Sequence, residues 1–414
     1  MTLRRASLFA FALLSLAAVA AAEGPRLKPV AGGRVKLLDA DAETGVSLAA
    51  IIDDLPLAHT AQLLPLDKQG ELVGGADAAA QAVQVFKNLG SALSAAGSSL
   101  ETVVKLNLYI ADESLISEIE RVVAQTFRGE LRPASSLVIS RLPHAGALVA
   151  ADAVGIVEPG RAPREVSLHR SPALAASALQ AHAAVLPAGQ RIYVSGQAEP
   201  GDLKAATRKT LDSLRSTLKF LGRDDRDVVQ IKAFVTPMSA AADVRQIVAE
   251  FFGGSVEPPL VLVEWESTAP IEIELIASGG PVANEDRDVG SKVEFLTPLG
   301  MTASPVFSRV ARLHGGPTIY ISGLYGRKAS PGADQVKEIF ATLNDALRAT
   351  GSDMRQLAKA TYYVADDDAS RALNELRPKY FDPARPPAAS KAMVRRVGRP
   401  GKTITLDMIA APIR

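Results

Sequence analysis

The sequence predicts an α+β protein of three tandem domains, whose sheets pack together in one chain as an intramolecular pseudo-trimer. Three observations support this prediction: one pattern of spaced residues occurs three times, each copy is of domain size, and helical and strand periodicities alternate inside each copy. A chain of 414 residues is long enough for about two to four domains with a sizeable buried core.

The repeat is marked by a glycine that ends a helical pattern, at Gly97, Gly222 and Gly351. After each glycine an apolar residue follows at six positions and opens a strand, an aromatic residue follows at 12, a Phe at 30 and a Pro at 36. In that order the positions are Val103, Val228 and Leu357; Tyr109, Phe234 and Tyr363; Phe127, Phe252 and Phe381; Pro133, Pro258 and Pro387. Agreement at so many offsets indicates a triplicated unit.

The composition between the copies shifts toward polar residues, which predicts the domain boundaries. Residues 158–170 are polar and contain Pro, and residues 278–292 are rich in Gly, Asp and Asn, so both are expected to be linkers. The predicted domains are therefore 33–157, 166–278 and 293–414.

The order of elements is clearest in the second unit. Alternating apolar and β-branched residues predict strands at 191–195, 228–235, 260–265 and 271–277, whereas spacings of three and four predict helices at 203–221 and 240–252. The other units repeat this order, with helices expected near 76–95, 115–127, 333–349 and 369–381. Two helices cover one face of such a sheet, so the other face is expected to pack against the other copies around a pseudo-threefold axis.

The first 22 residues have the pattern of a secretory signal peptide. Arg4 and Arg5 precede an apolar run at 6–19, and three alanines at 20–22 suit cleavage before Glu23. A membrane anchor is the alternative, but the apolar run is short for a span of about 20 residues. We therefore expect an exported protein, periplasmic or secreted, with no membrane contact after cleavage.

The composition excludes several classes of function. The chain has no Cys, which rules out disulfides, thiolate chemistry and zinc sites that need Cys. The five His are scattered without a pair at helical i, i+4 spacing, so no metal and no cofactor is expected. The net charge is +1 without a basic run, so no nucleic-acid partner is expected, and the expected partner is a small-molecule ligand.

Four segments resemble the Rid family, also called YjgF or endoribonuclease L-PSP. They are IYVSGQ at 192–197, IYISGL at 319–324, YFDPARPP at 380–387 and PIEIELIA at 270–277. The resemblance covers nearly all of the chain after residue 22, three times over. It implies trimers of a chorismate-mutase-like fold with small-molecule clefts between subunits, here fused into one monomeric chain. The best-known branch hydrolyses reactive enamines and imines to keto acids and ammonia, and other members are described as ribonucleases or translation inhibitors.

The resemblance also assigns site positions, and this sequence departs from most of them. The family's carboxylate-binding Arg falls two residues after the shared Pro, on Ser135, Leu260 and Ala389. Its Glu in the last strand falls on Ala150, Glu272 and Thr405. Its Ser-Gly turn is kept as Ser195-Gly196 and Ser322-Gly323 and becomes Thr60-Ala61 in the first unit; its helical Asn survives as Asn374.

These correspondences give two hypotheses for function. In the first, Glu272 and Ser195 are catalytic in an imine or enamine deaminase of altered substrate, while Ser135, Ser322, Asn374 and Lys391 bind the substrate. Lys391 lies on the same strand face as Ala389 and is expected to replace the lost cation. In the alternative, Glu272 and Lys391 are solvated surface charges, and the clefts serve a non-catalytic small-molecule-binding module. A ribonuclease is disfavoured because the chain has no His pair, metal cluster or basic groove.

Overall fold

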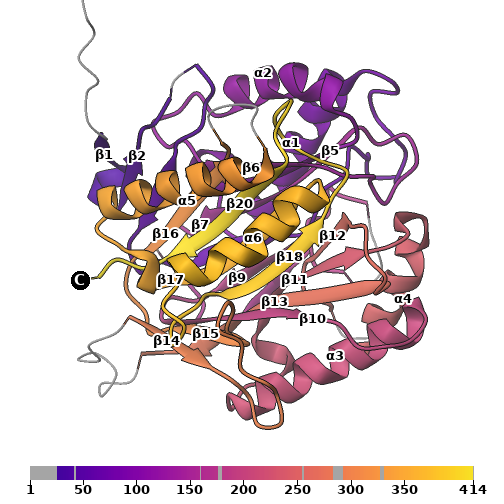
Figure 1. Ribbon diagram of the computed structural model, residues 1–414. Coiled ribbons are helices and arrows are strands. Elements are labelled where there is room, and N and C mark those ends of the chain that lie inside the picture. Colours follow the sequence, from indigo (N-terminus) through magenta and orange to yellow (C-terminus); the bar gives the residue numbers. More distant parts are fainter. Residues whose placement is uncertain are drawn as a thin grey trace, which may run out of the picture.

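The computed structural model describes residues 26–41, 43–158, 160–175, 180–253, 256–282, 292–326 and 331–413 (Figure 1). The predicted signal peptide at 1–22 and most of the second predicted linker lie outside the described residues. Within these ranges, no helix combines the length and the apolar character needed to cross a membrane.

The helices of the described chain follow the predicted pattern of two per unit, and their ends lie within two residues of the expected ones. They are α1 (Ala78–Ala95), α2 (Ile116–Thr126), α3 (Leu203–Phe220), α4 (Ala241–Phe251), α5 (Gly332–Ala349) and α6 (Asp367–Tyr380). Three of them begin with an aspartate cap: Asp77, Asp202 and Asp366 accept hydrogen bonds from the first-turn backbone. These caps satisfy N–H groups that the helix itself leaves unpaired.

The strands form three mixed sheets, one for each unit. In spatial order, the first sheet contains β19 (Arg396–Val397), β6 (Ala134–Ile139), β5 (Val103–Ile110), β7 (Val149–Ile156), β4 (Leu57–Thr60), β9 (Ala183–Leu186) and β8 (Ser167–His169). The second contains β12 (Leu260–Glu264), β11 (Val228–Val235), β13 (Ile271–Gly280), β10 (Gln190–Gln197), β15 (Val310–Leu313) and β14 (Val293–Leu296). The third contains β1 (Leu27–Val30), β2 (Val35–Leu38), β3 (Ala49–Ile52), β16 (Thr318–Leu324), β20 (Ile404–Ala410), β17 (Leu357–Val364) and β18 (Ala388–Met393).

Each sheet is completed by strands that come from another unit. Strand β9 of the second unit pairs with β4 of the first, and β15 of the third unit pairs with β10 of the second. Strand β3 of the first unit pairs with β16 of the third, which closes the cycle. Residues 167–169 of the first predicted linker form strand β8, so that part of the linker prediction is wrong. This cyclic connectivity is what a one-chain trimer requires, while the pseudo-threefold axis itself stays a prediction.

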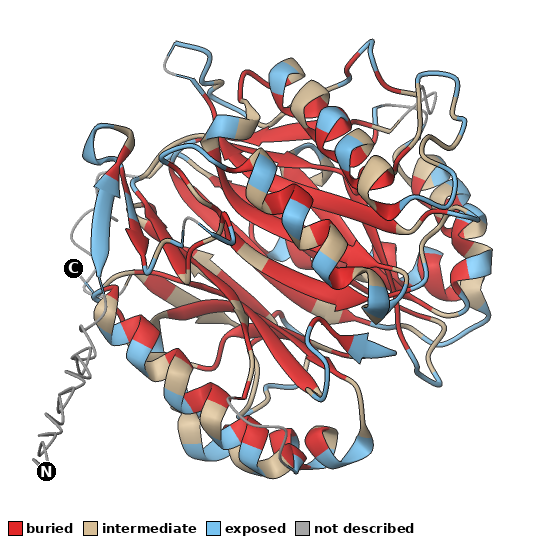
Figure 2. Ribbon diagram, turned by 90° about the horizontal axis from the view of Figure 1, so that it is seen from above, coloured by how far each residue is buried: buried red, intermediate tan, exposed pale blue. Residues whose placement is uncertain are grey.

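The helices lie on the outside and the strands inside. Figure 2 shows buried strands through the centre and helices at the periphery, with exposed residues along their outer faces. One face of each sheet packs on the two helices of its own unit. The helix residues Leu89, Leu214 and Leu343 each lie in one of the three separate cores formed in this way. The opposite faces meet in a shared core, which includes Tyr193 and Tyr320. The three units therefore share one interior, and the sites between them are fixed by packed sheets.

Candidate functional sites between the units

Both Ser-Gly pairs lie inside strands, where they form β-bulges instead of the expected turns. The register of β10 against β13 shifts between Val194 and Gln197, and that of β16 against β20 shifts between Ile321 and Leu324. A bulge bends its strand and changes the direction of its side chains. The bulged strand β10 of the second unit contacts β18 of the third, and the bulged strand β16 of the third unit contacts β6 of the first.

At the interface between the second and third units, hereafter the 2–3 interface, a hydrogen-bond chain crosses from β10 to β18. The backbone N–H of Gly196 donates to Ser390 Oγ at 3.1 Å, and Ser390 Oγ donates to Glu274 Oε2 at 2.7 Å. The carboxyl group of Glu272 lies directly against Gly196. The hydroxyl of Ser195 is buried and has no hydrogen-bond partner among the residues that the structure describes.

Glu272 is placed to exchange protons near neutral pH. Burial is the main cause that raises its pKa to about 7, and the neighbouring carboxylate of Glu274 adds to the rise, while Lys391 acts against it. Both protonation states of such a group are populated at pH 7, which is the condition for general acid–base catalysis. Glu272 is only partly exposed, so it does not lie on a fully solvated strand face.

Two cationic side chains of the third unit, Lys391 and Arg377, lie together near this site, and the charge of Lys391 acts on Glu272. Lys391 Nζ donates to Ser370 Oγ at 3.1 Å and lies 3.4 Å from Asn374 Oδ1. Arg377 Nη2 donates to the same Asn374 oxygen at 3.0 Å. Burial lowers the pKa of Lys391, the Arg377 charge lowers it further, and Glu272 opposes both.

At the 2–3 interface, the sequence interpretation missed Arg377. Its side chain is buried, and its guanidinium lies 5.2 Å from the ring centre of Tyr362. The available signal was its place four residues after Leu373, on the apolar face of the second helix. An arginine at such a position is unusual enough to suggest a function or a buried partner.

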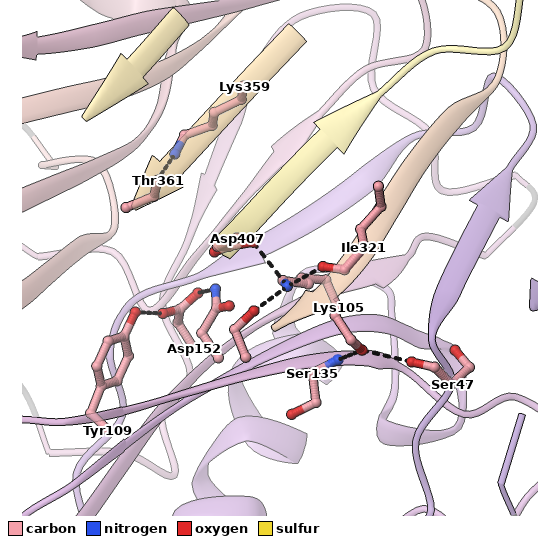
Figure 3. Close-up of polar contacts among 12 residues, drawn as sticks. Ser47, Lys105, Tyr109, Ser135, Asp152, Ile321, Lys359, Thr361 and Asp407 are labelled. Atoms are coloured by element: carbon pink, nitrogen blue, oxygen red, sulfur yellow. Dashed lines mark hydrogen bonds and ion pairs between the residues drawn. The ribbon is translucent and has the colours of Figure 1, made fainter. Parts of the chain in front are cut away.

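At the interface between the first and third units, hereafter the 1–3 interface, Ser322 holds the two units together. Its Oγ accepts a hydrogen bond from Ser135 N at 2.7 Å and donates to the carbonyl oxygen of Ser47 at 2.6 Å (Figure 3). A cavity of about 280 Å³ lies beside this contact. Thr405 stands where the second unit has Glu272, and its hydroxyl lies close to Gly323. This interface therefore offers space without a carboxylate at the position of Glu272.

The 1–2 interface, between the first and second units, is filled by direct contacts. Gln62 Nε2 donates to Leu262 O at 3.0 Å, and Gln62 N donates to Leu260 O at 3.1 Å. Gln230 Nε2 of the second unit donates to the carbonyl oxygen of Thr60 at 2.8 Å. Ala150 and Leu260 stand at the positions of the acid and the cation in this interface.

A buried cluster of charged side chains lies where residues of all three units meet (Figure 3). Lys105 pairs with Asp407 at 2.9 Å, and Lys359 pairs with Glu274 at 2.7 Å, each across a unit boundary. The carboxylate of Asp152 accepts a hydrogen bond from Tyr109 Oη at 2.7 Å. The cavity between these groups is about 30 Å³, room for a water molecule or two. Among the described residues, no three His, Cys, Asp or Glu side chains are placed to hold a metal ion.

The six site residues taken from the sequence thus lie at two interfaces. Four of them lie at the 2–3 interface: Ser195, Glu272, Asn374 and Lys391. The contacts to Glu272 and Ser390 are made by Gly196, the residue after Ser195. Ser135 and Ser322 bind each other at the 1–3 interface. The fold and these interfaces define a class: a single-chain α+β protein of three units with polar sites between them.

The chain belongs to the family described as endoribonuclease L-PSP, whose model matches residues 48–157, 172–278 and 301–412. Among curated relatives, it is 42% identical over 82 residues to RutC family protein PH0854 of Pyrococcus horikoshii, covering 19% of this chain and 64% of that protein. It is 34% identical over 80 residues to protein HMF1 of Saccharomyces cerevisiae, covering 19% and 61%. The chain thus spans less than two thirds of the length of these relatives.

Two solved structures are similar to parts of this chain. The Rid protein YyfB of Yersinia pestis is 28% identical, with a TM-score of 0.26, over 28% of this chain and 89% of that one. Yeast Mmf1 is 26% identical, with a TM-score of 0.24, over 27% and 86%. Each of these matches is the size of one unit.

Proposed function

We propose that this protein is an imine or enamine deaminase whose active site lies at the 2–3 interface. The observation that supports this most directly is the carboxyl group of Glu272, partly buried against Gly196, with a pKa of about 7. The substrate differs from the family's usual one, because the position of the carboxylate-binding arginine is Ala389.

In this proposal Glu272 moves the protons. Its carboxylate takes a proton from a water molecule while the water oxygen attacks the imine carbon. The resulting carboxyl group donates that proton to the nitrogen, which gives a carbinolamine. The carboxylate then takes the proton of the carbinolamine hydroxyl and passes it to the nitrogen as the C=O bond forms and the C–N bond breaks, which leaves a carbonyl compound and ammonia. Lys391 and Arg377 supply positive charge for a substrate carboxylate, and a charge-assisted hydrogen bond fixes the orientation of the substrate.

The test is imine hydrolysis by the purified chain and by Glu272→Gln. Imines with and without a carboxylate are generated by an amino-acid oxidase and an amine oxidase, and release of the carbonyl product is followed. We expect acceleration above background that Glu272→Gln abolishes. No acceleration on any imine would overturn the proposal.

A second candidate function is a non-catalytic small-molecule-binding module. It is favoured by the 1–3 interface, where a cavity of about 280 Å³ lies beside Thr405 and not beside a glutamate. Ligand binding by a chain that hydrolyses no imine would support this function. With either function we propose an exported monomer, released by cleavage after residue 22, and N-terminal sequencing of the secreted protein would test the cleavage.

A further inference from the structure

The cavity at the 1–3 interface takes no part in the proposed catalysis, and its walls are chemically specific. Its volume of about 280 Å³ is just below the usual range of about 300–1,000 Å³ for small-molecule sites, so it suits a small ligand. Leu108, Val123 and Leu137 form an apolar wall. Ser135 adds a hydroxyl whose oxygen has no partner in the described structure.

Arg399 reaches this cavity because strand β19 crosses from the third unit to the first. Strand β19 pairs with β6, and Gly398 N then donates to Leu137 O at 3.2 Å. A Cβ on Gly398 would lie 2.5 Å from a Leu137 methyl carbon, so only glycine permits this approach. The following residue, Arg399, is thereby held at the cavity.

The guanidinium of Arg399 is oriented by two neighbours. Its Nη1 is paired with Glu120, and its central carbon lies 5.8 Å from the ring centre of Tyr325, a cation–π distance. Arginine carries five N–H donors in a planar fork, and the pair with Glu120 occupies only one edge. The remaining edge suits a carboxylate.

Negative charge faces the same cavity from the first unit. Asp39 and Asp41 line it, and the Asp39 carboxylate accepts a hydrogen bond from Arg26 N at 2.9 Å. Hydrogen bonds from Glu43 N and the Thr44 hydroxyl lower the pKa of Asp41, which therefore stays ionised. Since Glu120 already balances Arg399, the lining carries an excess of negative charge that a simple carboxylate ligand would not satisfy.

We infer that this cavity binds a free α-amino acid with an apolar side chain. The ligand carboxylate binds Arg399, its ammonium group binds the carboxylates of Asp39 and Asp41, and its side chain packs on Leu137 and its apolar neighbours. A carboxylic acid without the amine gains no contact with the two aspartates, and an amine without the carboxylate gains no contact with Arg399. This inference does not rest on the proposed deaminase activity, because none of these residues lies at the 2–3 interface.

Isothermal titration calorimetry on the full chain tests the inference with three matched probes. They are L-leucine, 4-methylpentanoate, which lacks the amine, and 3-methylbutylamine, which lacks the carboxylate. We expect L-leucine to bind and each singly charged probe to bind about tenfold more weakly or worse, since each loses a charge-assisted contact.

Variants separate the two charged ends. Arg399→Met should weaken L-leucine about tenfold without changing the affinity for 3-methylbutylamine, and Arg399→Lys should also weaken it because the planar fork is lost. The double variant D39N/D41N keeps the backbone hydrogen bonds and should reduce the preference for L-leucine over 4-methylpentanoate. Arg396→Met is the matched control, since Arg396 pairs with Glu113 outside the cavity lining.

The result of the L-leucine titration can be distinguished from that of the deaminase assay with the Glu272→Gln variant. Glu272→Gln should leave L-leucine affinity unchanged, whether or not it abolishes imine hydrolysis. No binding of L-leucine at millimolar concentration, equal affinity for all three probes, or an Arg399→Met affinity equal to that of Arg396→Met would each overturn the inference.

Discussion

The carboxyl group of Glu272 lies against the α-carbon of Gly196, so closely that a side chain at residue 196 would collide with it. A Cβ built on Gly196 would be 1.9 Å from Glu272 Oε1 and 2.4 Å from the carboxyl carbon. The contact joins the bulge of β10 to the neighbouring strand β13. Glycine at this position therefore determines where the acid of the proposed site lies.

Gly196→Ala should displace the Glu272 carboxyl and reduce imine hydrolysis by about tenfold or more, as expected when a general acid–base group is misplaced. The measurement is kcat/KM for the imine, with circular dichroism to show that the fold is retained. Gly129→Ala is the control, because a Cβ there meets nothing within 4 Å. Full activity in a folded Gly196→Ala protein would show that the position of Glu272 does not matter.

The raised pKa of Glu272 predicts a stability change with pH. Its pKa is about 7 in the folded chain against an ordinary value of 4.5, so between these values the folded state holds a proton that the unfolded state has released. Stability should therefore fall as pH rises through this window. Glu272→Gln should be more stable than the parent by about 2 kcal/mol at pH 8, after allowance for its partial exposure, and equal to it at pH 4. Urea unfolding at both pH values measures this, and an equal difference at both would contradict it.

The elements inside each unit could be predicted from the sequence, because their signals are local. The leucines of α3 repeat at helical spacing. Residues 228–235 have the β-branched and aromatic pattern of a strand, and they form β11 over the same range in the structure. The exchange of strands between units could not be predicted. The pairing of Ala50 with Tyr320 joins residues far apart in sequence, and nothing local in β3 marks its partner. Strand β8 was missed for a different reason: it pairs with β9 of its own unit, but it lies in the polar segment 158–170, whose composition indicated a linker.

Part of the proposed site could also be predicted from the sequence. Glu272 and Lys391 were found because they fall at positions fixed by the repeat, and the structure places both at the 2–3 interface. Arg377 and Arg399 were missed because neither stands at a family position. Arg399 reaches its cavity through the crossing of β19, which depends on the close approach of Gly398 to another unit.

Lys391 should affect substrates that carry a carboxylate. Lys391→Met removes the charge and keeps the length, so KM for a carboxylate-bearing imine should rise about tenfold, while that for a carboxylate-free imine should not change. Lys337→Met is the control, because Lys337 is exposed and pairs with Asp334 on the surface of α5. An equal rise for both imines would indicate that Lys391 acts by positioning Glu272 or by stabilising the fold.

The central ion pairs should contribute far more to stability than those at the surface. Lys359→Met leaves the Glu274 carboxylate buried without its 2.7 Å partner, which should cost about 3–5 kcal/mol in the free energy of unfolding. Lys204→Met breaks a solvent-exposed pair with Asp243 and should cost less than about 1 kcal/mol. Both are measured by urea unfolding. Similar costs for the two variants would mean that the centre is more hydrated than the burial of these side chains indicates.

The exchange of strands predicts a monomer. In each sheet the strands from a neighbouring unit come from the same chain, and the pairing of β3 with β16 closes the cycle. Fusion keeps the units at high effective concentration, so no second chain is needed to cover the inner faces of the sheets. Analytical ultracentrifugation of the purified chain should therefore give the mass of one chain at micromolar concentration. A species of three chains that persists on dilution would mean that strands pair between chains. The 2–3 and 1–3 interfaces would then each be formed by residues of two different molecules.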